Sequence, residues 1–224
     1  MVMSGLGYSD DEGLINALGP ISDPDSAIGA SSVVDAGGYR LDVVCIDPSA
    51  LGQTVEVSAG SVQTQAGPQA HAPVATCPEG TVPFAGAAFT ERDGAVQTQE
   101  GAMSADYPTK TGWRAATWTT LGATDTFRVQ TSCMPRAQLG DIVRVTKKVQ
   151  VPASDDGGFY RAIATCPKGY RAFAGGGWWS DYSAVDSDLT MSTMEKNVRS
   201  WVVRGWSAGA QTLRARVTCT DRLG

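Results

Sequence analysis

Histidine, long apolar runs and charged residues are all scarce in this chain of 224 residues. His71 is the only histidine and no Cys-x-x-Cys pair occurs, which argues against a zinc site and against a histidine general base. No run of about 18 apolar residues is present, so we expect no membrane-spanning helix. Charged residues make up 18%, and Leu/Glu/Lys-rich stretches are missing, which favours strands and turns over helices.

Basic residues are outnumbered, and the formal net charge is -5. Because an acidic surface repels phosphate backbones, we do not expect nucleic acid as a partner. Neither a phosphate-binding glycine loop nor a calcium-loop spacing is found, so we expect no cofactor and no metal. The segment Met1–Leu6 lacks the basic and apolar regions of a secretory signal. The protein could leave its cell in two ways: with a signal peptide that was removed before this numbering begins, or by cell lysis, as virion components do.

An internal repeat is the main signal in the sequence. Val-Ala-Thr-Cys-Pro-Glu-Gly at 74–80 is followed by Phe-Ala-Gly at 84–86, and Ile-Ala-Thr-Cys-Pro-Lys-Gly at 163–169 by Phe-Ala-Gly at 173–175. Further on, Trp113 and Trp118 have counterparts in Trp201 and Trp206, which are separated by the same number of residues. The chain therefore contains two copies of one module.

Each module ends in a segment that alternates apolar or small residues with polar ones and stops at a cysteine. The segments are Phe127–Cys133 and Leu213–Cys219, and their period of two predicts strands with one buried face. A third such segment, Tyr39–Cys45, lies upstream without a Cys-Pro half of its own. An arginine precedes each cysteine by five residues, at Arg40, Arg128 and Arg214, and we expect these arginines on a polar strand face, paired with carboxylates.

The cysteines at the start and end of each module predict two disulfides, Cys77 with Cys133 and Cys166 with Cys219. The alternative is free thiols in the core. The Cys-Pro-x-Gly sequence predicts a strand that ends in a tight turn, because proline fixes φ and glycine permits the positive φ of a reversal. Cys45 is the fifth cysteine: either a buried thiol, the site of a bond to another chain, or part of an unexpected internal pair.

These patterns predict an all-β chain of two tandem, disulfide-closed antiparallel β-sandwich or barrel-like modules. We place an N-terminal arm with the orphan closing strand at 1–50, the first module at 51–139 and the second at 140–224. Thr54–Val57 and Arg144–Val151 are expected as strands that lead into the modules. Within the arm, a capping-box spacing at 9–12 predicts a short helix near 10–18.

Catalytic interpretations are weak. Gly205–Gly209 matches the Gly-x-Ser-x-Gly pattern, but no histidine follows Ser207, so we expect a hairpin turn. His71 is expected in an exposed loop. Asp181, Asp186 and Asp188 are expected in a solvated loop rather than around calcium.

Aromatic residues are better candidates for binding. Trp178 and Trp179 are adjacent in a strand-like stretch and should point to opposite faces, so that one of them could be exposed and could stack on a sugar or anchor a protein contact, with Tyr182 as a companion. The alternative is core packing, which we also expect for the four repeated tryptophans.

The pattern of Cys-Pro-x-Gly, glycine cluster, Trp-bearing strand and closing Cys resembles a module of secreted actinobacterial proteins and of phage or collagen-like fibre proteins. It covers Val74–Cys133 and Ile163–Cys219. The resemblance implies a surface-displayed, oligomeric β-domain without catalytic residues.

We therefore expect a non-enzymatic structural or assembly protein of a virion or extracellular surface, such as a decoration, fibre or surface-layer component. Its expected partners are protein subunits of the same or a larger assembly, and we expect a homo-oligomer. The alternative is a secreted carbohydrate-binding or adhesion protein that uses exposed tryptophan on cell-surface glycan.

Overall fold

The computed structural model describes residues 2–9, 14–20, 27–32, 39–45, 55–62, 69–97, 102–119, 122, 124–181, 187–195 and 198–222. Side chains are described only from Val55 onward. In the described part the chain is all-β and antiparallel, as predicted. The elements are β1 (Val2–Ser9), β2 (Leu14–Pro20), β3 (Ala27–Ser32), β4 (Tyr39–Cys45), β5 (Val55–Val62), β6 (Gln69–His71), β7 (Val74–Thr76), β8 (Thr81–Arg92), β9 (Ala95–Gln97), β10 (Ala102–Pro108), β11 (Gly112–Thr119), β12 (Asp125–Pro135), the 3-10 turn η2 (Arg136–Gln138), β13 (Ile142–Val151), β14 (Gly158–Thr165), β15 (Arg171–Trp179), β16 (Ser187–Met194), β17 (Ser200–Ser207) and β18 (Gln211–Thr220).

The two predicted modules have matching strands. In each module a lead-in strand (β5 or β13) pairs with the closing strand (β12 or β18), which pairs in turn with the strand that follows the Cys-Pro corner (β8 or β15, here called the opening strand). A hairpin carrying the repeated tryptophans follows, formed by β10 with β11 or by β16 with β17. Both Cys-Pro corners are tight turns, with Gly80 at φ +78° and Gly169 at φ +87°.

The N-terminal arm contains a third copy of the opening and closing strands. β1 pairs with β4 in the register that β8 adopts with β12 and β15 with β18. Each opening strand has a β-bulge at the same position, just after the residue opposite the cysteine. The residues opposite Cys45, Cys133 and Cys219 are Val2, Pro83 and Ala172, and those opposite Arg40, Arg128 and Arg214 are Tyr8, Phe89 and Trp178.

We therefore divide the chain into an arm repeat (2–45), a middle repeat (55–135) and a C-terminal repeat (142–220). The arm repeat also has the hairpin, formed by β2 and β3. Among the described strands it has no counterpart of the lead-in strands β5 and β13, so β4 is the last strand of its sheet.

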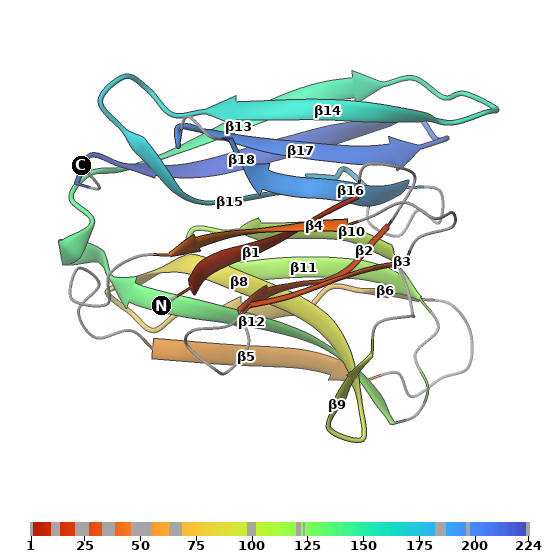
Figure 1. Ribbon diagram of the computed structural model, residues 1–224, viewed down its shortest axis with the longest axis horizontal. Coiled ribbons are helices and arrows are strands. Elements are labelled where there is room, and N and C mark those ends of the chain that lie inside the picture. The colour runs from red at the N-terminus through yellow and green to blue at the C-terminus, as the bar shows by residue number, and fades with distance from the viewer. Residues whose placement is uncertain are drawn as a thin grey trace.

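The strands form three sheets, and each sheet combines strands of two repeats. Sheet A has the order β14-β17-β16-β1-β4, sheet B β3-β2-β8-β12-β5, and sheet C β13-β18-β15-β10-β11-β6. In every sheet an opening strand pairs with the hairpin of another repeat: β1 with β16, β8 with β2, and β15 with β10. Strand pairing thus continues from one repeat to the next. In Figure 1, β13, β14, β17 and β18 lie at the top, β5 and β12 at the bottom, and the arm strands between them.

One apolar core receives side chains from all three sheets. Its largest fully buried members include Trp179, Trp201, Phe84 and Phe127. Two repeated tryptophans lie flat on the glycines of the opening strands, since a Cβ built on Gly86 would be 2.0 Å from the Trp113 ring and one on Gly175 would be 2.2 Å from the Trp201 ring. One glycine of each cluster seen in the sequence, Gly86 or Gly175, therefore makes room for an indole ring.

Three expectations about local structure differ from the structure. Asp188 lies in strand β16, opposite Trp206, and not in a solvated loop. The short helix expected near 10–18 is replaced over Leu14–Pro20 by strand β2, while 10–13 lie outside the described residues. An isolated helix of that length is marginal, whereas the strand gains backbone partners in both β3 and β8. His71 is 6% exposed in β6, opposite Thr117, and so is not in an exposed loop.

Candidate functional site

Both predicted disulfides are present. Cys77 bonds to Cys133 and Cys166 to Cys219, with Cα–Cα distances of 5.7 and 5.8 Å. Each bond ties the corner before an opening strand to the end of the closing strand. Two such bonds indicate an oxidising compartment of the extracellular type. Cys45 holds the equivalent position at the end of β4, opposite Val2, but its side chain is outside the described part of the chain.

Trp178 and Trp179 point to opposite faces of β15, as predicted, but neither is exposed. Trp179 is 0% exposed in the common core, where its indole nitrogen donates to the Asp188 carbonyl at 3.1 Å. Trp178 is 7% exposed on the outer face of sheet C. The suggested companion Tyr182 lies outside the described residues. Trp113 and Trp201 are core residues, while Trp118 and Trp206 are partly buried.

Trp178 is covered by an aromatic and cationic stack that sequence reasoning missed. The Tyr107 ring lies 4.1 Å from the Trp178 ring with an interplanar angle of 22°. The Arg216 guanidinium carbon is 4.6 Å from the centre of the Trp178 ring and 5.3 Å from that of Tyr107, and the Arg214 carbon is 5.8 Å from Trp178. Because β10 supplies Tyr107 and β15 supplies Trp178, the stack covers the seam between the middle and C-terminal repeats.

More basic side chains lie beside this stack, on the outer face of β18 and of its neighbour β13. Arg214 lies opposite Lys148, Arg216 opposite Thr146, and Thr218 opposite Arg144, so all of these side chains share the outer face of β13 and β18. We call Arg144, Lys148, Arg214 and Arg216 the cationic face. Burial and repulsion from Arg136 and Arg216 lower the pKa of Arg144, while burial and repulsion from Arg214 lower the pKa of Arg216.

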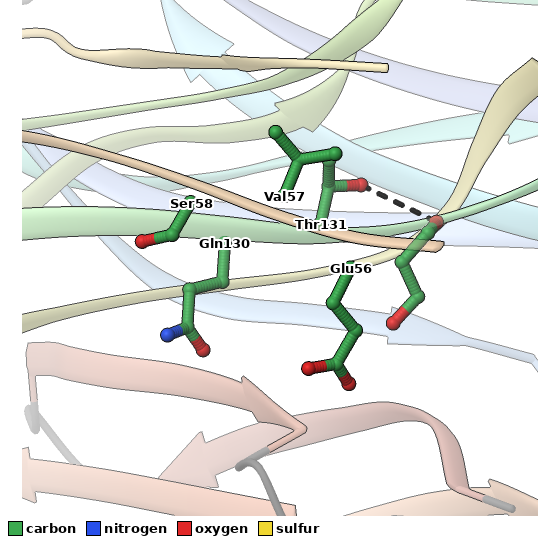
Figure 2. A pocket seen from close by; sticks show the side chains of 6 residues that line it. Glu56, Val57, Ser58, Gln130 and Thr131 are labelled. Atoms are coloured by element: carbon green, nitrogen blue, oxygen red, sulfur yellow. Dashed lines mark hydrogen bonds between the residues drawn. The ribbon is translucent and has the colours of Figure 1, made fainter. Parts of the chain in front are cut away.

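The matching face of sheet B is different. Arg128, the counterpart of Arg214, pairs with Glu91 across the sheet, so one of the repeated arginines has the expected carboxylate partner. Glu56, Ser58, Gln130 and Ser132 border a shallow hollow of about 90 Å³ on this sheet. Figure 2 shows Glu56, Ser58 and Gln130 pointing to one side of the sheet, with Val57 and Thr131 pointing to the other.

Two buried carboxyl groups have shifted pKa values. Asp106 is 3% exposed; burial raises its pKa to about 7, although the Trp113 indole donates a hydrogen bond to it at 2.5 Å. Asp125 is 0% exposed, yet its pKa is lowered to about 2, mainly because Arg92 donates two hydrogen bonds to it. Asp106 faces the core beneath the stack, and Asp125 starts β12.

The remaining candidates have structural surroundings. Ser207 ends β17 at the hairpin to β18, and its buried hydroxyl lies 2.8 Å from that of Ser187 and donates to the Gly209 carbonyl. Within the described residues, no group of three or more His, Cys, Asp or Glu side chains could hold a metal ion. In that same part, no helix is long and apolar enough to cross a membrane.

No protein-family model matches this chain, and no curated protein is significantly similar to it.

Two signals for the cationic face are visible in the sequence. Arg214 and Arg216 both occupy the outward positions of an alternating strand, and Arg144 and Lys148 do the same in Arg144–Val151. The sequence alone does not show that these strands pair, nor that β10 brings Tyr107 beside Trp178.

Proposed function

We propose that this chain is a non-enzymatic structural protein of a virion or extracellular surface structure that assembles through contacts with other protein subunits. In this proposal, the main contact between subunits forms when a neighbouring subunit pairs one of its strands with the outer edge of β4. The resemblance of the modules to those of secreted and fibre proteins supports this role.

The observation that carries the proposal is the edge of sheet A. In sheets B and C the closing strands β12 and β18 are covered by β5 and β13. In sheet A the closing strand β4 is the last of the described strands. An uncovered strand edge presents unpaired N–H and C=O groups and readily accepts another strand. Cys45 ends β4, so in this proposal its thiol would bond to the incoming subunit.

The test uses peptides that imitate the missing lead-in strand. A peptide with the sequence of Ile142–Val151, which covers the equivalent edge of β18, should bind the β4 edge and dissociate the assembly, whereas a scrambled peptide should not. Light scattering measures the assembly, and non-reducing mass analysis of the native protein and of Cys45→Ser measures the interchain bond. A chain that stays monomeric at all concentrations, or an assembly that ignores both peptides, contradicts the proposal.

The alternative is a glycan-binding protein that stacks sugar directly on Trp178 or Trp179. The burial of both indoles favours assembly over that mode of binding, because neither ring presents a free face to solvent.

A further inference from the structure

We propose that the cationic face of sheet C binds an acidic polysaccharide, one whose sugars carry carboxylate or sulfate groups. Arg144, Lys148, Arg214 and Arg216 would contact the anionic groups, and the exposed hydroxyl of Thr146 between them would contact the sugar. This goes beyond the proposed assembly role and uses a different sheet from the β4 edge.

The first support is that these cations have no acidic partner among the described side chains. Among the described side chains, the ion pairs join Arg92 to Asp125, Arg128 to Glu91 and Arg161 to Glu195, and none includes the cationic face. Arg216 donates instead to Thr146 and to the Pro108 carbonyl, and Arg144 to the Lys110 carbonyl. Like charges on directly opposed residues, as in Lys148 and Arg214, destabilise a sheet unless something neutralises them.

The second support is the contrast with sheet B, which has the same strand arrangement. By register, Arg144 corresponds to Glu56, Lys148 to Gly60 and Arg216 to Gln130. Arg128 corresponds to Arg214 but is paired with Glu91. The fold therefore does not require four unpaired cations at these positions, since the middle repeat forms the same sheet without them.

The third support is that the face has unused hydrogen-bonding groups. Thr218 is 1% exposed and its hydroxyl has no partner, and the Nε atoms of Arg144 and Arg214 are likewise unpaired. Buried polar atoms are normally satisfied, so such a group points to a ligand or to bound water. The rings of Trp178 and Tyr107 also hold Arg216 in place, which lowers the entropy cost when its N–H groups bind an anion.

The dimensions of the face favour a saccharide over nucleic acid. With about 3.3 Å per strand residue, the cations extend over about 13 Å along β13, and the strands are about 4.8 Å apart. Duplex DNA carries a charge about every 1.7 Å and would extend well beyond these four cations, over a chain whose net charge is -5. A polysaccharide with neutral hydroxyl-bearing sections between its anionic groups matches a face of this size with fewer unpaired charges.

The test measures binding of the native protein to heparin and to polygalacturonate by titration calorimetry at low salt. We expect binding to at least one of them, weakened by salt and reduced about fivefold or more in Lys148→Gln and in Arg214→Gln. Arg128→Gln, the same change at the matching position of sheet B, and Lys168→Gln, which removes an exposed charge at a Cys-Pro corner, should bind as the native protein does. Lys148 is exposed, so its variant should melt like the native protein.

Several outcomes overturn this proposal. They are no binding to either polysaccharide, equal loss in the control variants, or tighter binding to duplex DNA than to either polysaccharide. The assembly proposal is tested separately, because Lys148→Gln should leave the oligomeric state unchanged and the lead-in peptide should leave heparin binding unchanged.

Discussion

Gly86 and Gly175 occupy positions where a side chain cannot be accommodated. A Cβ at either position would lie within 2.2 Å of an indole ring that is itself 3% exposed or less. The ring cannot move away because it is fixed in the common core. Glycine at these sites is therefore a packing requirement of the repeated tryptophans.

We predict that Gly175→Ala lowers the free energy of unfolding by about 1 to 3 kcal/mol or more, because the methyl group overlaps the Trp201 ring. Gly209→Ala is the control, since nothing lies within 4 Å of its Cβ position. Chemical denaturation of the two variants measures the difference. Equal stability of the two would contradict the packing of Trp201 on β15.

Asp106 and Asp125 should give opposite pH dependences. The pKa of Asp106 rises from 3.8 in the unfolded chain to about 7 in the fold, so the folded state keeps a proton that the unfolded state loses. The contribution of Asp106 to the free energy of unfolding is therefore fully present below about pH 4 and is lost as the pH rises through about 7. The pKa of Asp125 falls from 3.8 to about 2, so its contribution is present above about pH 4 and is lost as pH falls towards 2.

We predict that Asp106→Asn is more stable than the native protein at pH 8, on the order of a few kcal/mol, and that the advantage disappears at pH 4. The amide oxygen can still accept the Trp113 hydrogen bond. Asp125→Asn should instead be less stable at pH 8, because it loses its ion pair with Arg92. Thermal melts of both variants at the two pH values measure this. An Asp106→Asn protein that is less stable than the native protein at pH 8 would show that the carboxylate is not buried as described.

The closing strands show what a disulfide does for one element. β18 is the central strand between β13 and β15, and its Cys219 is held to the corner that begins β15. Replacing Cys166 and Cys219 together with serine should lower stability by about 3 to 5 kcal/mol, because the unfolded chain regains the freedom of a long loop. Denaturation of this variant against the native protein tests the expectation, and a change below about 1 kcal/mol would contradict it.

The elements differ in how well they could be predicted. β12, β18 and the Cys-Pro corners follow from local patterns of alternation, proline and glycine, and the structure confirms them. β2 does not, because Ser9–Glu12 followed by Leu14, Ile15 and Leu18 fits a capped helix as well as a strand. Pairing with β8 decides the outcome, and that contact is between residues far apart in the sequence. The stack of Tyr107 on Trp178 was unpredictable for the same reason.

At the scale of the whole molecule, three repeats close a ring by exchanging strands. The opening strands of the arm, middle and C-terminal repeats pair with hairpins of the C-terminal, arm and middle repeats in turn. Only the orphan strand Tyr39–Cys45 revealed the first repeat in the sequence, since its opening strand shares Gly5 with the others but lacks their Phe-Ala-Gly sequence. The strand register shows that the arm repeat is equivalent to the other two, which its amino-acid sequence does not show.

This account predicts where a third disulfide would form. Cys77 precedes Pro83, and Cys166 precedes Ala172, by six residues, so the equivalent position lies six residues before Val2. The sequence Cys-Pro-Glu-Gly-Thr added directly before Met1 places a cysteine there, and the same extension with serine in its place is the control. Peptide mapping without reduction should show the added cysteine bonded to Cys45, with Cys77–Cys133 and Cys166–Cys219 unchanged. If Cys45 stays free or the added cysteine bonds elsewhere, the arm is not a third repeat and the ring of three sheets is wrong.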